Sequence, residues 1–108
     1  MTLDKKYILG KDTKILIVGL GMIGGSYASA LSKQGYSVSA ITRSASTVDY
    51  ALSRGMIEKG TDTPDPALIE DADLIIIALY PHTLISWIEE NQNYFKPGAV
   101  ITDVTGVK

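Results

Sequence analysis

Blocks of apolar residues recur along the chain, and the spacing of the apolar positions changes from one block to the next. Four runs are apolar or β-branched over nearly their whole length: "KILIVG" (14–19), "YSVSAIT" (36–42), "LIIIAL" (74–79) and "AVITDV" (99–104). Short continuous runs of this kind are typical of strands that are covered on both faces. The pattern therefore predicts four buried strands.

Helical spacing fills most of the chain between these runs. Residues 22–31 predict a helix that closes at Gly35, and a second helix is expected from a cap at Ser46 or Thr47 to Arg54, ended by Gly55. The segment 61–73 is interpreted as a loop with a short helical turn, because Pro64 and Pro66 prevent a longer helix at its start.

A third helix is predicted over 81–95, with its sheet-facing side formed by Leu84, Ile85, Trp87 and Ile88. Strands that alternate with helices predict a parallel sheet with right-handed crossovers. We expect an α/β fold, a doubly wound parallel sheet in a single domain over residues 14–108. Residues 1–13 are interpreted as an N-terminal arm.

A glycine cluster separates the first predicted strand from its helix. Gly19, Gly21 and Gly24 fit the pattern G-x-G-x-x-G in the strand-to-helix context that gives this motif its meaning. Gly19 makes the tight turn, Gly21 lets a pyrophosphate approach the backbone, and Gly24 lets the helix pack closely on the strand. Backbone N–H groups of the first helical turn supply anion-binding donors, and we expect Gly19, Gly21, Met22 and Ile23 to hold the pyrophosphate through their backbone N–H groups. The motif predicts a Rossmann-type dinucleotide site.

The end of the second predicted strand bears on the identity of the nucleotide. An NAD site carries an acidic residue there to bind the ribose 2′-hydroxyl, whereas this chain has Thr42 followed by Arg43. An arginine beside the hydroxyl groups of Thr42, Ser44 and Ser46 suits a 2′-phosphate. NADP is the preferred cofactor by this reasoning, with NAD as the alternative.

Composition narrows the remaining choices. The net charge of -2, from 10 basic and 12 acidic residues, gives no general attraction to nucleic acid or an anionic membrane. With no cysteine, thiolate chemistry is excluded, and the acidic residues between Asp62 and Asp73 are interpreted as a solvated loop rather than a metal site. No apolar run is long enough to cross a bilayer and no signal peptide is recognised, so we expect a cytoplasmic protein.

Three segments, "GLGMIGGSYASAL", "DADLIIIALYP" and "TDVTGVK", make the chain from Lys14 to Lys108 similar to the prephenate and arogenate dehydrogenases of tyrosine biosynthesis. The resemblance implies hydride transfer from a cyclohexadiene to a nicotinamide with loss of carbon dioxide. It implies that Leu79, Tyr80 and Pro81 line the cofactor path, with Asp103 and Thr105 near the nicotinamide. Ligands in such sheets lie beyond the carboxyl ends of the strands.

The same resemblance implies parts that this sequence does not contain. Family members carry a helical substrate and dimerisation domain and a catalytic histidine beyond the "VK" motif. The single histidine, His82, does not match it and is interpreted as a surface residue near the cofactor cleft. We therefore expect no catalytic residue here, no activity from this piece alone, and a homodimer only with the missing domain.

Two positions depart from the family pattern. Gly106 stands where a substrate-binding serine is frequent, which leaves open whether Thr105 replaces it, and Tyr80 stands where a small hydroxyl residue is usual. The choice between prephenate and arogenate stays open. Two alternatives also remain: another two-domain dehydrogenase or reductase, and a stand-alone nucleotide-binding regulatory module.

Overall fold

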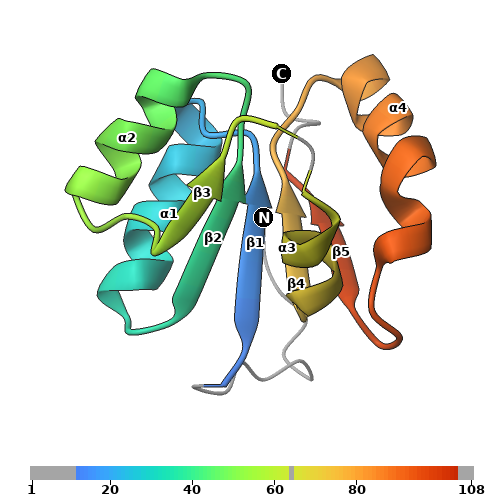
Figure 1. Cartoon of the computed structure of the whole chain (residues 1–108), viewed down its shortest axis with the longest axis horizontal. Coiled ribbons are helices and arrows are strands. Elements are labelled where there is room, and N and C mark those ends of the chain that lie inside the picture. The colour runs from blue at the N-terminus through green and yellow to red at the C-terminus, as the bar shows by residue number, and fades with distance from the viewer. Residues whose placement is uncertain (1–11, 64, 105–108) are drawn as a thin grey trace.

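A parallel sheet with helices on both faces forms the centre of the molecule (Figure 1). The computed structural model describes residues 12–63 and 65–104, and within them the sheet has five strands. The strands are β1 (Lys14–Val18), β2 (Ser37–Ile41), β3 (Lys59–Thr61), β4 (Leu74–Ile77) and β5 (Val100–Asp103). The helices are α1 (Met22–Lys33), α2 (Ala45–Ser53), α3 (Pro66–Asp71), α4 (Pro81–Asn91) and the 3₁₀ helix η1 (Gln92–Tyr94).

The strand order is β3-β2-β1-β4-β5, and every neighbouring pair is parallel. The chain runs outward from β1 through β2 to β3, then returns to the other side of β1 and continues through β4 to β5. This reversal places a topological switch point between β1 and β4. The predicted Rossmann-type doubly wound sheet is confirmed.

Alternate residues of each central strand face opposite layers. In β1, Ile15 and Ile17 belong to the core cluster under α1 and α2, while Leu16 and Val18 belong to the cluster under α3 and α4. All four residues of β4 are buried, which explains why its sequence reads as a continuous apolar run. The side-chain alternation thus fixes which helices cover which face.

Three predicted details are wrong. The sequence predicts four strands, but β3 adds a fifth at the edge of the sheet, where it pairs with β2 in a segment without an apolar run. Ser44, and not Ser46 or Thr47, caps α2 by accepting the Thr47 N–H at 3.3 Å. Ile85 is 58% exposed, so the sheet-facing side of α4 is formed by the other three predicted residues only.

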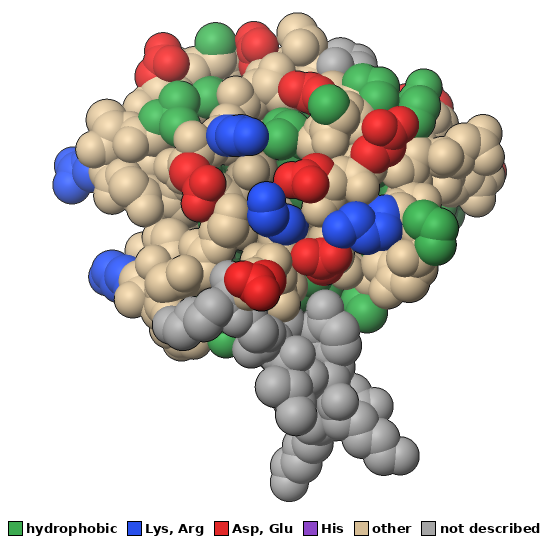
Figure 2. All heavy atoms as spheres, turned by 60° about the horizontal axis from the view of Figure 1, so that its bottom comes forward, with side chains coloured by type: hydrophobic (Ala, Val, Ile, Leu, Met, Phe, Trp, Pro, Cys, Tyr) green, Lys and Arg blue, Asp and Glu red, His purple; other side chains and the backbone are tan. Residues whose placement is uncertain are grey.

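Charged side chains gather at the amino edge of the sheet, the face shown in Figure 2. Asp73 accepts hydrogen bonds from the Lys14 backbone N–H at 2.8 Å and from Lys96 Nζ at 2.6 Å. These contacts lower the pKa of Asp73, with the Lys96 hydrogen bond as the largest cause. Asp73 therefore connects the beginnings of β1 and β4 with the turn that precedes β5.

Two sequence interpretations concern what the chain lacks. In the ranges 12–63 and 65–104, no group of three or more histidine, cysteine or acidic residues is placed to hold a metal ion. No helix of the described segments is long and apolar enough to cross a bilayer.

The interpretation of the acidic residues 62–73 as a solvated loop needs correction. Asp65 caps α3 by accepting the Leu68 N–H, and Asp73 accepts from the Lys14 backbone N–H and from Lys96 Nζ.

Candidate functional site

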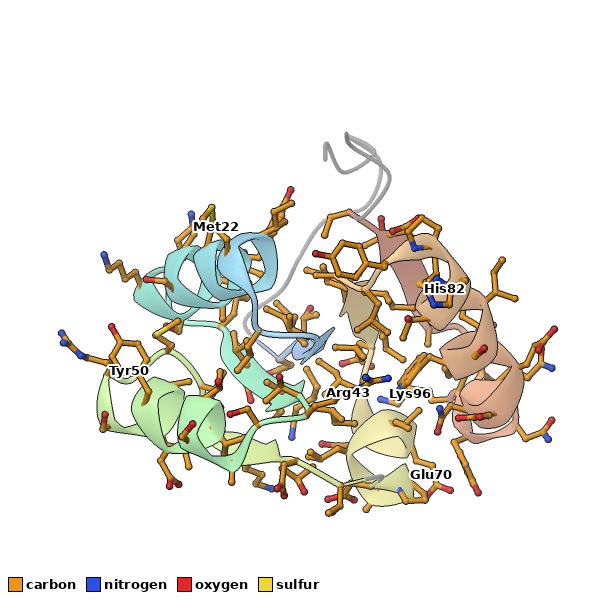
Figure 3. All side chains as sticks on the ribbon, turned by 90° about the horizontal axis from the view of Figure 1, so that it is seen from above. Met22, Arg43, Tyr50, Glu70, His82 and Lys96 are labelled. Atoms are coloured by element: carbon orange, nitrogen blue, oxygen red, sulfur yellow. The ribbon has the colours of Figure 1, made fainter. Side chains whose placement is uncertain are left out.

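Four of the predicted site segments meet at the carboxyl edge of the sheet, seen from above in Figure 3. The glycine turn follows β1, residues 42–44 follow β2, residues 79–81 follow β4, and Asp103 ends β5. Thr105 and most of the predicted N-terminal arm lie outside the described residues, so their predicted roles have no structural account. Parallel α/β sheets bind ligands at this edge, beside the switch point.

The turn after β1 is held tightly against β2 and β4. Gly19 has a φ of +96°, and its N–H donates to the Ile41 carbonyl at 2.8 Å. The expectation that the Gly19 N–H binds the pyrophosphate is therefore wrong, because this donor is used within the sheet. A Cβ on Gly19 would lie 2.6 Å from the Ala78 carbonyl oxygen, and one on Gly24 would overlap the Gly19 carbonyl oxygen. Both positions therefore require glycine for structural reasons, as the motif predicts.

Gly21 has a different environment. A Cβ there would have no atom within 4 Å, and the backbone angles, φ −72° and ψ −159°, suit any residue. The fold itself therefore does not demand glycine at this position. The space that a side chain would fill lies open in front of the turn, which is what close approach of a diphosphate requires.

The first turn of α1 offers hydrogen-bond donors beside this space. The first α-helical bond runs from the Gly25 N–H to the Gly21 carbonyl at 2.8 Å. The N–H groups of Met22, Ile23 and Gly24 precede it and make no hydrogen bond within the described residues, as expected at a helix N-terminus. Together with the helix dipole they form a site for an anion that needs no basic side chain.

The end of β2 contributes one cation and two hydroxyl groups. Arg43 is exposed, and Figure 3 shows it above the middle of the carboxyl edge, between the α1–α2 half and the α4 half. Ser44 Oγ accepts the Thr47 N–H and lies 3.0 Å from Ser46 Oγ. Each hydroxyl has one hydrogen, and one of the two serines uses it in the bond between them, so the pair retains one hydroxyl hydrogen that can be donated to a phosphate.

Thr42 differs from its neighbours, because its backbone serves the sheet. Its N–H donates to the Thr61 carbonyl at 3.0 Å and continues the pairing of β2 with β3. The residue is half-buried. The pairing with β3 therefore fixes the backbone of Thr42, next to the exposed Arg43.

The end of β4 forms the other side of the candidate site. The Ala78 N–H donates to the Val18 carbonyl at 2.8 Å, which keeps this segment beside the glycine turn. Leu79 packs into the core cluster under α3 and α4, Tyr80 is 73% exposed, and Pro81 begins α4. His82 lies exposed on the first turn of α4 (Figure 3).

Beyond β4, the sheet closes the site with β5. Asp103 is exposed at the end of this strand, and the next residue, Val104, donates its N–H to the Ile77 carbonyl at 3.0 Å. The carboxylate therefore lies at the same edge as the segment after β4, in agreement with its predicted position.

A hollow at the opposite edge is not the candidate site. It is bordered by Lys14, Ser37, Ser39, Glu58 and Lys59 at the amino ends of the strands. In parallel sheets this edge is not the one that binds ligands. We therefore assign the site to the carboxyl edge.

Comparison with known proteins decides the family. Residues 14–108 match the model for the NAD binding domain of 6-phosphogluconate dehydrogenase. The chain belongs to this family of NAD-binding domains. Its fold and its glycine turn are those that such a domain requires, and the nucleotide site predicted from the motif agrees with this membership.

Solved structures of related dehydrogenases and reductases share the fold. Arogenate dehydrogenase from Synechocystis is 32% identical with a TM-score of 0.79, covering 89% of this chain and 34% of that one. Prephenate dehydrogenase from A. aeolicus, in complex with hydroxyphenyl propionate and NAD+, is 26% identical with a TM-score of 0.76 and the same coverages. A reductive aminase from Aspergillus terreus, in complex with NADPH, is 25% identical with a TM-score of 0.66, covering 90% and 33%.

These matches confirm the resemblance to prephenate and arogenate dehydrogenases that the three sequence segments predict. The chain spans about one third of the length of the solved structures it matches. It is the NAD-binding domain of a dehydrogenase family, and the neighbours include reductases as well.

Proposed function

We propose that this chain is the NADP(H)-binding part of a prephenate or arogenate dehydrogenase, an enzyme that oxidises and decarboxylates its substrate in tyrosine biosynthesis. The observation that carries the proposal is the open space at Gly21 beside the unpartnered N–H groups of α1. The two relatives named for these activities support it, since both have higher TM-scores than the reductive aminase.

The residues of this chain hold and orient the cofactor in the proposal. Met22 and Ile23 bind the diphosphate through their backbone N–H groups, and Gly21 leaves room for it. Arg43, Thr42 and Ser44 bind the adenosine 2′-phosphate. When bound, the nicotinamide supplies the hydride acceptor, while the acid–base groups for the substrate come from the remainder of the enzyme.

The preference for NADP rests on charge at the end of β2. A carboxylate there would repel a 2′-phosphate, whereas the Arg43 guanidinium attracts it and forms two parallel hydrogen bonds. The exposed position of Arg43 leaves its donors accessible. The Ser44 and Ser46 hydroxyls, hydrogen-bonded to each other at 3.0 Å, add one further donor beside Arg43.

Calorimetric titration of the chain with NADPH and NADH tests the proposal. We expect tighter binding of NADPH and loss of most of the difference in Arg43→Ala, because the 2′-phosphate then has no cation. Arg54→Ala is the matched control, since Arg54 is an exposed arginine at the end of α2 that lies over the Tyr50 ring. Equal affinities for the two nucleotides in the wild-type chain would contradict the assignment of Arg43.

The same titration separates this proposal from its alternatives. Failure to bind either nucleotide would reject a cofactor domain of any dehydrogenase or reductase. The reaction itself is tested in the longer enzyme with prephenate and arogenate as substrates, since substrate contacts are expected outside this chain. If the longer enzyme turns over an imine or a hydroxy acid but neither prephenate nor arogenate, another two-domain dehydrogenase or reductase is favoured. If it turns over none of these substrates, a regulatory module is favoured.

Two further expectations accompany the proposal. A homodimer is expected to form through the domain that relatives carry in addition to this one, and a cytoplasmic location fits a biosynthetic enzyme. Sedimentation of the 108-residue chain beside the longer enzyme tests the first. A dimer of the chain alone would contradict it.

A further inference from the structure

The carboxyl edge carries uncovered apolar side chains on both sides of the glycine turn. Met22 is 89% exposed, Ile23 41% and Tyr80 73%. The first two begin α1, and Tyr80 precedes α4 on the other side of the switch point. An exposed apolar patch beside a binding site commonly marks a surface that a ligand covers.

The backbone around Tyr80 is fixed, although its side chain is exposed. The Tyr80 carbonyl accepts the Leu84 N–H at 2.8 Å as the first bond of α4, and Pro81 follows directly. The Tyr80 side chain makes no capping hydrogen bond to α4 within the described residues. The ring is therefore carried on a rigid base and is available for a contact that the chain itself does not provide.

The residues after β4 leave the Tyr80 ring outside both core layers. Ala78 packs against the core under α1 and α2, and Leu79 packs against the core under α3 and α4. Among the described residues, Tyr80 belongs to neither core cluster and is 73% exposed. Its ring therefore lies at the carboxyl edge, which also carries the glycine turn and the space in front of Gly21.

Strand order assigns this side of the turn to one half of a dinucleotide. β2 and β4 lie on opposite sides of β1. With the diphosphate at the turn after β1 and the adenosine phosphate at Arg43 after β2, the nicotinamide half extends over the end of β4. Tyr80 is the exposed aromatic residue there.

We propose that the Tyr80 ring stacks on the nicotinamide end of the bound dinucleotide, opposite the start of α1. This proposal rests on the proposed function. Planar heteroaromatic rings gain from stacking on an aromatic side chain, and the gain does not depend on the phenol hydroxyl. Tyr80 thus makes the site selective for an intact dinucleotide over its nicotinamide-free half.

The test compares NADPH with 2′-phospho-ADP-ribose, which lacks the nicotinamide, by calorimetry on the full chain. Tyr80→Ala is expected to weaken NADPH binding about tenfold and to leave 2′-phospho-ADP-ribose within about twofold. Tyr80→Phe keeps the ring and is expected to bind both as the wild type does. Tyr50→Ala is the control, because Tyr50 is 55% exposed on the outer side of α2 (Figure 3).

Two results would overturn the proposal while leaving the proposed function intact. NADPH affinity unchanged in Tyr80→Ala would show that the ring does not cover the nicotinamide. Equal losses of affinity for NADPH and 2′-phospho-ADP-ribose in Tyr80→Ala would place the ring on the adenosine half or show a disturbed turn. The same comparison with NADH and ADP-ribose repeats the test without the 2′-phosphate. If the wild-type chain binds none of these nucleotides, the proposed function and this inference fall together.

Discussion

Gly21, Gly24 and Gly25 lie within five positions of one another, yet the surroundings of their missing side chains differ. A Cβ on Gly24 would overlap a backbone oxygen, whereas one on Gly21 would face open space. A Cβ on Gly25 would make an ordinary contact, 3.7 Å from the Met56 methyl group. Stability and cofactor binding can therefore be separated by substitution at these three positions.

We expect Gly24→Ala to lower the free energy of unfolding by about 1–3 kcal/mol or more, because the neighbouring atom is backbone and cannot move aside easily. Gly25→Ala is expected to raise it by about 0.5–1 kcal/mol, since alanine is the better helix former and fits. Urea denaturation measures both. A Gly24→Ala protein as stable as the wild type would contradict the close packing of α1 on the turn.

Gly21→Val is expected to leave the free energy of unfolding within about 0.5 kcal/mol, because the side chain meets no protein atom. Its binding of NADPH should fall at least about tenfold, since the branched side chain occupies the place of the diphosphate. Denaturation and calorimetry on the same preparation measure the two quantities. Undiminished binding would exclude Gly21 from the site.

Residue-scale prediction from sequence succeeds where a motif has one structural solution. Gly19 and Gly24 are examples, because few other residues tolerate those positions. Ser44 shows the opposite case: three hydroxyl residues, Ser44, Ser46 and Thr47, all suit a helix cap, and the choice depends on where β2 stops pairing. That stopping point is set by tertiary contacts that the local sequence does not contain.

Among the secondary-structure elements, the beginnings of β1, β4 and β5 depend on one carboxylate. Asp73 accepts from Lys14 and Lys96, residues that are 59 and 23 positions away in sequence. Its backbone also donates to the Lys14 carbonyl at 2.8 Å and accepts from Val100 at 2.9 Å. Through its carboxylate and its backbone together, Asp73 thus connects the beginnings of three strands whose opposite ends carry the candidate binding segments.

Asp73→Asn is expected to lower the free energy of unfolding by about 1 kcal/mol near neutral pH, a value kept small because the pair is partly exposed. Folding lowers the pKa of Asp73 below 3.8, so its charge stabilises the fold above that value. The difference between wild type and variant should therefore shrink as the pH falls below about 4 and vanish below the folded-state pKa. Denaturation across this pH range measures it.

Asp71→Asn is the matched control for this prediction. Asp71 lies 3.6 Å from the Lys14 ammonium, but both side chains are more than half exposed. Such pairs contribute little, so the variant should be as stable as the wild type within about 0.5 kcal/mol. Equal changes in the free energy of unfolding for Asp73→Asn and Asp71→Asn would show that the hydrogen bonds of Asp73 contribute no more stability than an exposed ion pair does.

Prediction of elements follows the strength of the apolar pattern. β1 and β4 are continuous apolar runs and were recognisable directly, whereas β3 is the tripeptide Lys-Gly-Thr and becomes a strand only through pairing with β2. On α4, the buried side is narrower than the apolar positions suggest, so Ile85 lies outside it. Periodicity indicates a helix more reliably than it indicates the width of the buried side.

In the whole molecule, the candidate binding residues and the Asp73 contacts lie at opposite edges of the sheet. The carboxyl edge holds the glycine turn, Arg43 and Tyr80, while the amino edge holds the Asp73 contacts. The sequence predicts the segments at the carboxyl edge, because they follow recognisable strands. The contacts at the amino edge join side chains that are distant in sequence, and no local motif indicates them.

Binding at one edge is expected to stabilise the entire fold. At about 100 times its Kd, a ligand adds about 2.7 kcal/mol to the free energy of unfolding. For a domain of this size that corresponds to a rise in Tm of about 10–20 °C. Thermal denaturation with NADPH measures the shift. A tenfold weaker affinity in Gly21→Val should reduce it to about half or less at the same NADPH concentration. An equal shift in that variant would place the nucleotide elsewhere.

The open space in front of Gly21 has a consequence for how the cofactor preference of such a domain can evolve. Under the proposed function it accommodates only the two phosphates common to every dinucleotide, so the glycine turn can stay the same while the cofactor changes. A change of preference toward NADH would then need substitutions after β2, around Arg43. A change in how the nicotinamide end is bound would need substitutions after β4, around Tyr80. The two adjustments should be separable in the laboratory.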